Sequence, residues 1–463
     1  MSKTSTISVY SSTPGLAAFE LLRAEGEPWL AECYVPPADF ELMAGLSSAV
    51  VFGAAGSGKT ALYACLRAEV MPLDRPPARL ACEWTPESRT GATASSDTVA
   101  ADWQQILREL SMALIRHVAQ WPAGYRQAKD WAKATLRWLA HTSLAKELDS
   151  AIAEQSVGIS AAGKAALRDL AKNKLNGFLD SASAKGVQVE LVKGLGELGL
   201  SGACVLVGPE SFADRPAPSQ NLIALLSTLN LFETDHFAFK FIFPAQFEQS
   251  LSAAGAMSTR RIAVHYLHWQ RDELTFVVET RLKLASAGRA LRLADICQDD
   301  QLIEWLSRVG GKSPRGWLEQ ARPLVAHYLQ RLRLGRSDSI TAAEWQKIRA
   351  DKPPRLTLDL TSDEVVAGHR VVDLRERKVE LVLLKYLYRN RGHVCTRDEL
   401  YHKAYYPALY PTGRLESKDL LNEYRDVIDT AIWRLRQEIE PDPKRPLFVV
   451  TRKGEGLELR NAW

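Results

Sequence analysis

The sequence predicts an α/β protein: a parallel sheet with helical insertions, a helical segment after it, and a smaller C-terminal domain. Helical periodicity fills residues 100–198 and 269–333. After residues 351–354, a short stiff Asp-Lys-Pro-Pro linker, alternating apolar segments indicate a separate domain. Apolar runs typical of strands buried in a parallel sheet lie at residues 49–52, 79–84, 203–207 and 237–243.

The composition is that of an ordinary globular chain with about three domains. The chain has 463 residues, of which 46% are hydrophobic and 25% charged, and its net charge is +4. This mild basicity does not by itself indicate nucleic-acid binding. The six cysteines form no C-x-x-C pair, which favours reduced thiols. Apolar runs long enough for a signal peptide or a membrane span are absent, so we expect a cytoplasmic protein.

The segment from Gly53 to Thr60, Gly-Ala-Ala-Gly-Ser-Gly-Lys-Thr, fits the phosphate-binding pattern G-x-x-x-x-G-K-[ST]. It lies between a predicted strand and a predicted helix at residues 61–69, which is the context that the pattern requires. Its glycines allow a tight turn that points N–H groups inward, and the helix N-terminus adds partial positive charge. We therefore expect a nucleoside triphosphate, ATP, with Mg²⁺.

Each residue of this segment has an expected role. Lys59 would reach the β- and γ-phosphates, and Thr60 would ligate Mg²⁺. The expected nucleotide-binding residues of the segment are Gly53, Gly56, Ser57, Gly58, Lys59 and Thr60.

The strand at residues 203–207 is the expected second nucleotide strand. Such strands usually end in an Asp that holds Mg²⁺, but here Gly208 occupies that position. Only Glu210 and, further on, Asp214 offer a carboxylate. Glu210 is therefore the candidate catalytic residue, near Mg²⁺ or the attacking water, and the alternative is a loop acid in a degenerate site. If the protein is an enzyme, we expect an ATP hydrolase with this departure from the usual motif.

Three further polar residues have two interpretations each. Gln246, just past the strand at 237–243, is either a γ-phosphate sensor or an ordinary strand-end residue. Arg260 and Arg261 are either charge-stabilising arginines or part of a solvated surface.

Residues about 16–330 resemble a P-loop ATPase of the AAA+/STAND kind. The resemblance rests on the phosphate-binding segment, two of the apolar strands, and Gly311-Lys312-Ser313-Pro314-Arg315. That last stretch is similar to the G-x-P-R element of the family's helical lid, whose arginine senses the γ-phosphate. The resemblance implies this nucleotide-binding role for Arg315. It also implies a P-loop nucleotide-binding domain at 1–265, with a helical insertion at about 100–198, and a helical lid at 266–350.

Residues 355–463 resemble the winged-helix domain of OmpR/PhoB-type transcription regulators. The matching segments include Ile432-Trp433-Arg434-Leu435-Arg436 and Thr451-Arg452-Lys453-Gly454-Glu455-Gly456. In that family the helix with the first segment enters the major groove, and the hairpin with the second is the wing near phosphate. The resemblance implies double-stranded DNA as a partner, with groove contacts from Arg434 and Arg436 and wing contacts from Arg452 and Lys453.

The charge of this C-terminal segment favours a different interpretation. Residues 355–463 contain 20 Lys or Arg and 18 Asp or Glu, whereas a tight DNA binder carries a strongly basic surface. The expected recognition helix also carries Asp426, Asp429 and Trp433, and carboxylates near phosphates lower the affinity. A winged helix that contacts a partner protein therefore stays open beside DNA binding.

These observations favour a nucleotide-controlled switch in a bacterial cytoplasm, in which nucleotide state repositions the winged helix and so regulates transcription. Two alternatives stay open. The first is an oligomerising STAND-type ATPase of a bacterial defence or genome-maintenance system. Its Arg260 or Arg261 would complete a neighbour's site in a homo-oligomer, and its winged helix would bind a partner protein or nonspecific DNA. The second is a scaffold that binds ATP without turnover, for which Gly208 is the main support.

Overall fold

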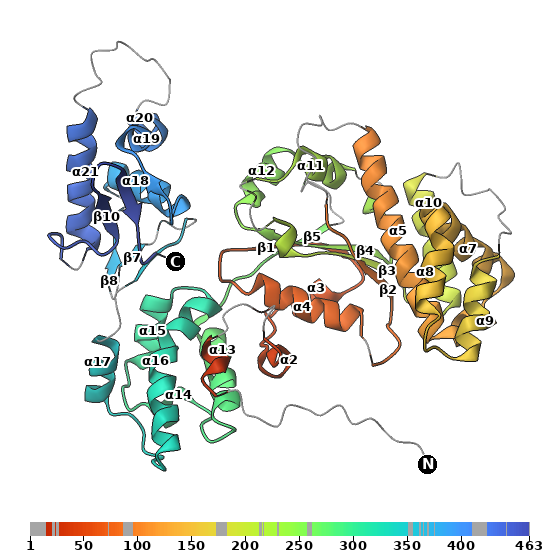
Figure 1. Cartoon of the computed structure of the whole chain (residues 1–463), viewed down its shortest axis with the longest axis horizontal. Coiled ribbons are helices and arrows are strands. Elements are labelled where there is room, and N and C mark those ends of the chain that lie inside the picture. Colours follow the sequence, from red (N-terminus) through yellow and green to blue (C-terminus); the bar gives the residue numbers. More distant parts are fainter. Residues whose placement is uncertain are drawn as a thin grey trace, which may run out of the picture. The chain divides into compact units, whose positions relative to one another are not determined.

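The structure, a computed structural model, divides into two compact units, which are described separately (Figure 1). The first comprises Leu21–Thr280 with Ser313–Arg315, and the second comprises Met1–Glu20, Arg281–Lys312 and Gly316–Trp463. The structure describes residues 15–462 except 21–23, 25–26, 73, 87–95, 173–182, 213–214, 216, 229–230, 257–261, 351–354, 361–362, 364, 368–369, 375, 410–423 and 441.

A five-stranded parallel sheet forms the centre of the first unit. The strand order is β2-β3-β4-β1-β5, and all neighbouring strands run parallel. This sheet confirms the α/β class and gives a P-loop NTPase-like arrangement, because the expected phosphate loop follows β1. The strands are β1 (Ser48–Gly53), β2 (Leu80–Glu83), β3 (Ala203–Val207), β4 (Phe237–Pro244) and β5 (Ile262–Tyr266).

Strand β4 shows why both faces of the sheet are buried. Its side chains alternate between faces, so Phe237, Phe239, Phe241 and Phe243 lie on one face, with successive rings 5.4–6.0 Å apart. These rings join the larger core, whereas Ile242 joins a smaller core on the other face. Helices must therefore cover the sheet on both sides.

Helices on the two faces of the sheet come from different parts of the chain (Figure 1). On the face with the smaller core lie α3 (Phe40–Ala44) and α4 (Lys59–Val70). On the other face lie α11 (Gln220–Ser227), α12 (Phe247–Ala253) and part of the helical insertion. Helix α2 (Leu30–Cys33) precedes them. The loop that joins β1 to α4 consequently opens at the carboxyl edge of the sheet.

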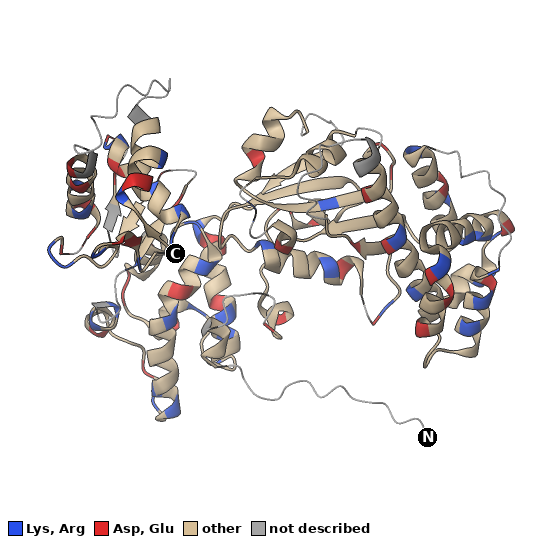
Figure 2. Ribbon diagram, turned by 45° about the horizontal axis from the view of Figure 1, so that its top comes forward, with Lys and Arg blue, Asp and Glu red and all other residues tan. Residues whose placement is uncertain are grey.

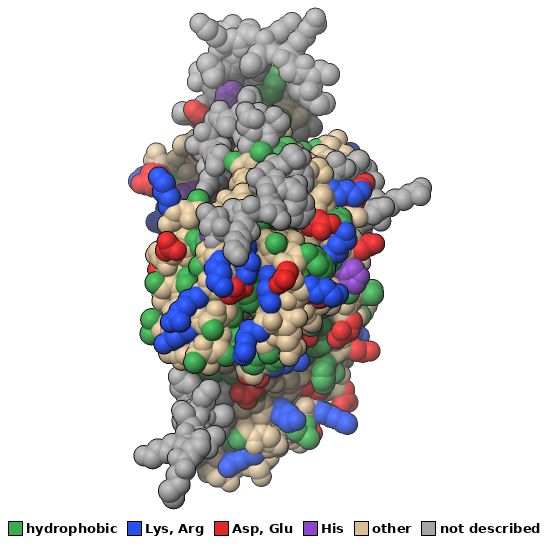
Figure 3. All heavy atoms as spheres, turned by 90° about the vertical axis from the view of Figure 1, so that its right-hand side faces the viewer, with side chains coloured by type: hydrophobic (Ala, Val, Ile, Leu, Met, Phe, Trp, Pro, Cys, Tyr) green, Lys and Arg blue, Asp and Glu red, His purple; other side chains and the backbone are tan. Residues whose placement is uncertain are grey.

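A block of helices is inserted between β2 and β3. Its longest member, α5, packs on β2 and on most of the other insertion helices. Figure 3 looks onto this block and shows acidic and basic side chains interspersed. Asp169, for example, forms ion pairs with Arg137 and Lys172. The helices are α5 (Ser96–Gln120), α6 (Pro122–Gln127), α7 (Asp130–Leu144), α8 (Leu148–Gln155), α9 (Ala161–Leu170) and α10 (Ala184–Glu197).

Two helices carry the chain between the units: α13 (Arg271–Ala285) and α16 (Pro314–Arg333). The short α1 (Ala17–Glu20) belongs to the second unit, where the Arg281 guanidinium donates a 2.8 Å hydrogen bond to the Ala18 carbonyl. This bond ties the N-terminal helix to the residues after Thr280, and the expected domain bounds at 1–265, 266–350 and 355–463 stay predictions. The unit also contains α14 (Leu293–Ile296), α15 (Leu302–Gly310) and α17 (Ala342–Ala350).

The C-terminal part of the second unit has short strands and helices around its own apolar core. A sheet β6-β7-β8 is followed by helices and then by a sheet of order β10-β11-β9. Among the described helices of the whole chain, none is long and apolar enough to cross a membrane. The elements are β6 (Leu356–Leu358), β7 (Val365–Ala367), β8 (Arg370–Val372), α18 (Lys378–Arg389), β9 (Val394–Cys395), α19 (Arg397–Leu400), α20 (Tyr406–Leu409), α21 (Tyr424–Ile439), β10 (Val449–Arg452) and β11 (Gly456–Leu459).

Candidate functional site

The predicted phosphate loop connects the buried strand β1 to the first turn of α4. Gly56 and Gly58 have φ angles of 77° and 92°, in the left-handed region that glycine adopts without strain. At Gly53, a Cβ would overlap the Ser57 hydroxyl and lie 2.9 Å from Cγ of Lys59. Gly56 and Gly58 are therefore favoured by their positive φ angles, and Gly53 is favoured because neighbouring side chains leave no room for a Cβ.

Lys59 begins α4, and its side chain folds over the loop. Its ammonium donates hydrogen bonds to the carbonyls of Gly53 and Ala54, at 2.8 and 2.7 Å. Burial, and after it the positive charge of Arg315, lower the pKa of Lys59 to about 8. Both effects disfavour the charged form of Lys59. An anion bound here would stabilise that charged form, so its binding would be favourable. Thr60 follows in the first turn of the helix and is half-buried.

Arg315 lies beside the loop, although about 255 residues separate the two along the chain. Its backbone N–H donates to the carbonyl of Gly56 at 3.4 Å, and a Cβ on Gly56 would lie 3.2 Å from Cβ of Arg315. The structure therefore brings Arg315 together with Gly56 and Lys59. This residue lies in the first turn of the long helix α16, which begins at Pro314.

Trp269 also contacts the loop, although sequence reasoning found only a helical apolar pattern at this residue and no functional signal. Its indole Nε1 donates a 2.8 Å hydrogen bond to the carbonyl of Ser57. The Ser57 hydroxyl is buried and has no hydrogen-bond partner among the described residues. A buried hydroxyl of this kind carries a desolvation cost that a ligand oxygen would relieve.

Glu210 lies after β3 in the short helical turn Pro209–Phe212, which packs against α4. Its carboxylate contributes to the raised pKa of Tyr63, after burial and the hydrogen bond that the Tyr63 hydroxyl donates to Glu83. Tyr63 is one helical turn beyond Thr60. The structure therefore places Glu210 and Thr60 toward the same side of α4.

The other expected polar residues do not join this group in the described structure. The Gln246 amide donates to the Arg215 carbonyl at 3.1 Å, which makes it part of a loop contact. Arg260, Arg261 and Asp214 lie outside the described residues. The same is true of most of the segment between β2 and α5.

The described residues contain no cluster of three or more His, Cys, Asp or Glu side chains that could hold a metal ion. A Mg²⁺ ion at a nucleotide site does not need one, since it commonly takes one or two carboxylates together with phosphates and water. Thr60 and Glu210 are the described residues that we predict for this smaller ligand set.

In the C-terminal part, the four arginine and lysine candidates have different surroundings. Arg436 donates to the Val449 carbonyl at 2.9 Å and to the Thr451 hydroxyl at 2.8 Å, so it joins α21 to β10. Arg452 donates to Glu458 at 2.7 Å within the β10–β11 hairpin. Arg434 and Lys453 are exposed. Groove and wing contacts from these residues stay predictions.

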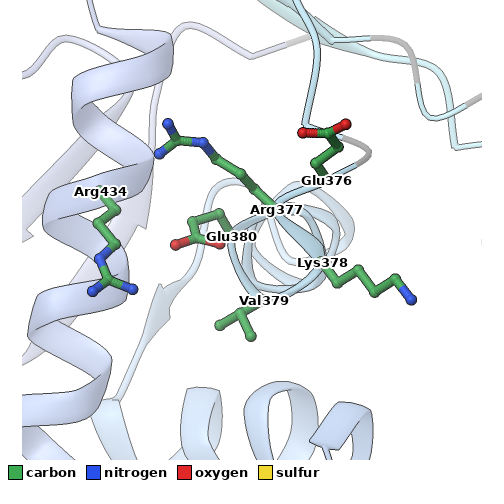
Figure 4. Close-up of a pocket in the computed structure, with 6 residues that line it drawn as sticks. All are labelled: Glu376, Arg377, Lys378, Val379, Glu380 and Arg434. Carbon is green, nitrogen blue, oxygen red and sulfur yellow. The ribbon is translucent and has the colours of Figure 1, made fainter.

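Arg434 also lines a shallow hollow of about 470 Å³ between α18 and α21. Figure 4 shows Arg377 and Glu380 extending from the start of α18 toward α21, while Lys378 points away. Arg377 is paired with Glu438 of α21 at 2.7 Å. The hollow therefore mixes both signs of charge, as does the ribbon of α21 in Figure 2.

Comparisons with known proteins give limited matches, and no family model matches the sequence. The sensory transduction protein RegX3 of Mycolicibacterium smegmatis is 30% identical over 139 residues, which are 30% of this chain and 54% of that protein. The chain thus spans about half the length of this curated relative. The structure of the Aeropyrum pernix ORC1 protein in complex with DNA aligns over 96% of this chain and 93% of that chain, with 14% identity and a TM-score of 0.32.

Proposed function

We propose that this protein is a nucleotide-controlled switch that binds ATP with Mg²⁺ at the loop Gly53–Thr60. The observation that carries this proposal is the half-buried Lys59 ammonium beside Arg315, at the N-terminus of α4. Two neighbouring cations and a helix N-terminus favour a polyanion at this place. The unpartnered Ser57 hydroxyl adds a polar group that such a ligand would satisfy.

Different residues of the site would bind different parts of ATP and Mg²⁺. Lys59 would exchange its two carbonyl acceptors for phosphate oxygens, which accept stronger, charge-assisted hydrogen bonds. Arg315 would add a second positive charge from the start of α16. Thr60 and Glu210 would hold Mg²⁺, which neutralises phosphate charge when bound. Trp269 would keep the loop in its binding shape through the Ser57 carbonyl.

For the output we propose DNA binding by a winged helix over residues 355–463, and hence transcription control. Support comes from the helices, the small sheets and the β10–β11 hairpin of this part. The name of the relative RegX3, a sensory transduction protein, suits a regulatory role. Exposed Arg434 and Lys453 are the side chains best placed to meet phosphates, since Arg436 is bound to β10.

A second candidate for the output is a partner protein, and one observation favours it. Trp433 on α21 is 60% exposed, and Val427 on the same helix is 37% exposed. Exposed aromatic side chains are enriched at protein interfaces, whereas the carboxylates of Asp426 and Asp429 would oppose DNA phosphates. Retention of duplex DNA at low salt decides between the two outputs.

Nucleotide binding is tested by titration calorimetry with ATP and Mg²⁺. We expect Lys59→Ala to lower ATP affinity by 100-fold or more, on the order of two charge-assisted hydrogen bonds. Lys312→Ala, a nearby basic residue before α16, is the matched control and should bind as the unaltered protein does. Equal ATP affinity of the Lys59→Ala variant, or no ATP binding by the unaltered protein, would refute the proposed site.

A further inference from the structure

The end of β3 lacks the Asp that usually holds the metal at such sites, and the structure shows what stands there instead. The Glu210 side chain folds back over the Cα atom of Gly208. A Cβ built on Gly208 would overlap Oε1 of Glu210 and lie 2.6 Å from its Cδ and 2.7 Å from its Oε2. A side chain at position 208 and this position of the Glu210 carboxylate therefore exclude each other.

This carboxylate lies close to the place that an Asp carboxylate at position 208 would take. In an Asp at position 208, the carboxyl carbon would lie about 1.5 Å from the Cβ, the length of one carbon–carbon bond. The Glu210 carboxyl carbon lies 2.6 Å from that Cβ position. The two carboxylates would thus be displaced by no more than a few ångströms.

The turn that positions Glu210 is anchored at both ends. The Ser211 backbone N–H donates to the Gly208 carbonyl at 3.3 Å. Phe212 is fully buried, with its ring 5.0 Å from Phe243 and 5.6 Å from Phe247. Glu210 stands between these two anchors. The backbone position of Glu210 therefore follows from the turn, while its side chain is exposed at the end of β3.

The neighbouring strands place this carboxylate at the same edge of the sheet as the phosphate loop. Strands β1 and β3 flank β4, so their ends lie about 10 Å apart. The turn that carries Glu210 also packs on α4, the helix that begins with Lys59 and Thr60.

We propose that Glu210, seated on Gly208, is the metal-holding carboxylate of this site and replaces the Asp that β3 lacks. This inference rests on the proposed ATP binding and deepens it. On this view, glycine is present at position 208 because it leaves room for the Glu210 carboxylate, and the site keeps a metal ligand. Mg²⁺ would take Glu210 and Thr60 from the protein, directly or through water.

The test measures how Mg²⁺ changes affinity for a fluorescent ATP analogue, with EDTA as the metal-free arm. In the unaltered protein we expect Mg²⁺ to tighten binding about 10-fold or more, the scale of effects at metal sites. Glu210→Gln, which keeps the size of the side chain, should lose this gain and keep the metal-free affinity. Gly208→Ala should behave likewise, because its methyl group displaces the carboxylate. Glu69→Gln, at the far end of α4, should change nothing.

A double variant makes the test specific to position. Gly208→Asp combined with Glu210→Ala returns a carboxylate to the strand end, and we expect it to regain the Mg²⁺-dependent gain that Glu210→Ala alone loses. Mn²⁺ binding to the protein with a non-hydrolysable ATP analogue, followed by electron paramagnetic resonance, gives a second readout.

Two results would overturn this inference while nucleotide binding stands. One is an unchanged Mg²⁺ gain in Glu210→Gln, and the other is a folded double variant without recovery. If the unaltered protein binds no nucleotide in either arm, the proposed function itself fails and this inference falls with it.

Discussion

At the scale of one residue, the Lys59 ammonium is hydrogen-bonded to carbonyls of its own loop, and its lowered pKa makes ATP binding depend on pH. Its pKa is lowered from 10.5 to about 8, first by burial and then by Arg315. In the free protein the cation is therefore lost as pH rises through about 8. Triphosphate oxygens favour the charged form, so ATP binding above this pH must restore the proton.

We expect ATP binding to take up a proton, in an amount that rises between pH 8 and pH 9.5, and ATP affinity to fall over the same range. Calorimetry in two buffers with different ionisation enthalpies measures the uptake. Lys240 is a matched control, because burial also lowers its pKa to about 8 while its ammonium bonds to the Ser47 carbonyl at the other edge of the sheet. Lys240→Met should keep the uptake, and uptake that disappears with Lys240 would contradict the assignment.

Local residue patterns predicted the phosphate loop, because eight consecutive residues and their flanking elements carry the whole signal. The seat of Glu210 on Gly208 could not be predicted this way. It depends on a side chain that folds back over a backbone atom two residues earlier. The bond from Trp269 to Ser57 was missed for a related reason, since it joins residues 212 positions apart and an apolar pattern looks the same with or without it.

At the scale of elements, side-chain hydrogen bonds join the end of α21 to β10. Arg436 bonds to β10, and the buried Glu440 accepts hydrogen bonds from the backbone N–H groups of Leu447, Phe448 and Val449. Arg434, two residues before Arg436, faces outward. The two arginines of the I-x-R-L-R run therefore differ in their surroundings: Arg436 is bonded to β10, whereas Arg434 is exposed. The family resemblance implies DNA contacts for both.

We expect Arg436→Ala to lower the free energy of unfolding by about 2 kcal/mol, because two hydrogen bonds from a charged group are lost. Arg434→Ala should leave stability within about 0.5 kcal/mol, as is usual for exposed positions, and should weaken DNA retention. Chemical denaturation and DNA retention at low salt measure the two effects. A stable Arg436→Ala variant with selectively reduced DNA binding would instead make Arg436 a groove contact.

In the large sheet, strand prediction worked for the runs buried on both faces and failed for the half-exposed edge strand β5. The runs that became β1, β3 and β4 are almost wholly buried. Edge strand β5 was not predicted, because Ala263, Val264 and Tyr266 are exposed and Arg260 and Arg261 precede it in the sequence. An edge strand that is half exposed has no continuous apolar run, so its pairing with β1 becomes visible only in the sheet.

At the scale of the whole molecule, α16 is one of the two helices that run from the first unit into the second, and it is the one that begins beside the loop. It begins beside Gly56 and continues for 20 residues to Arg333, in the second unit. A ligand that changes the contact between Arg315 and the loop therefore acts on one end of a helix whose other end lies in the unit with the C-terminal strands and helices. Coupling requires that ATP bind the two states of this contact with different affinity.

The most direct test of the switch measures duplex DNA retention at low salt with ATP, with ADP and without nucleotide, for the unaltered protein and for Lys59→Ala. We predict that ATP changes DNA affinity by about 5-fold or more, the lower end of usual allosteric coupling, and that Lys59→Ala shows no change. DNA binding that is identical in all three nucleotide conditions, in a protein that binds ATP, would contradict the account.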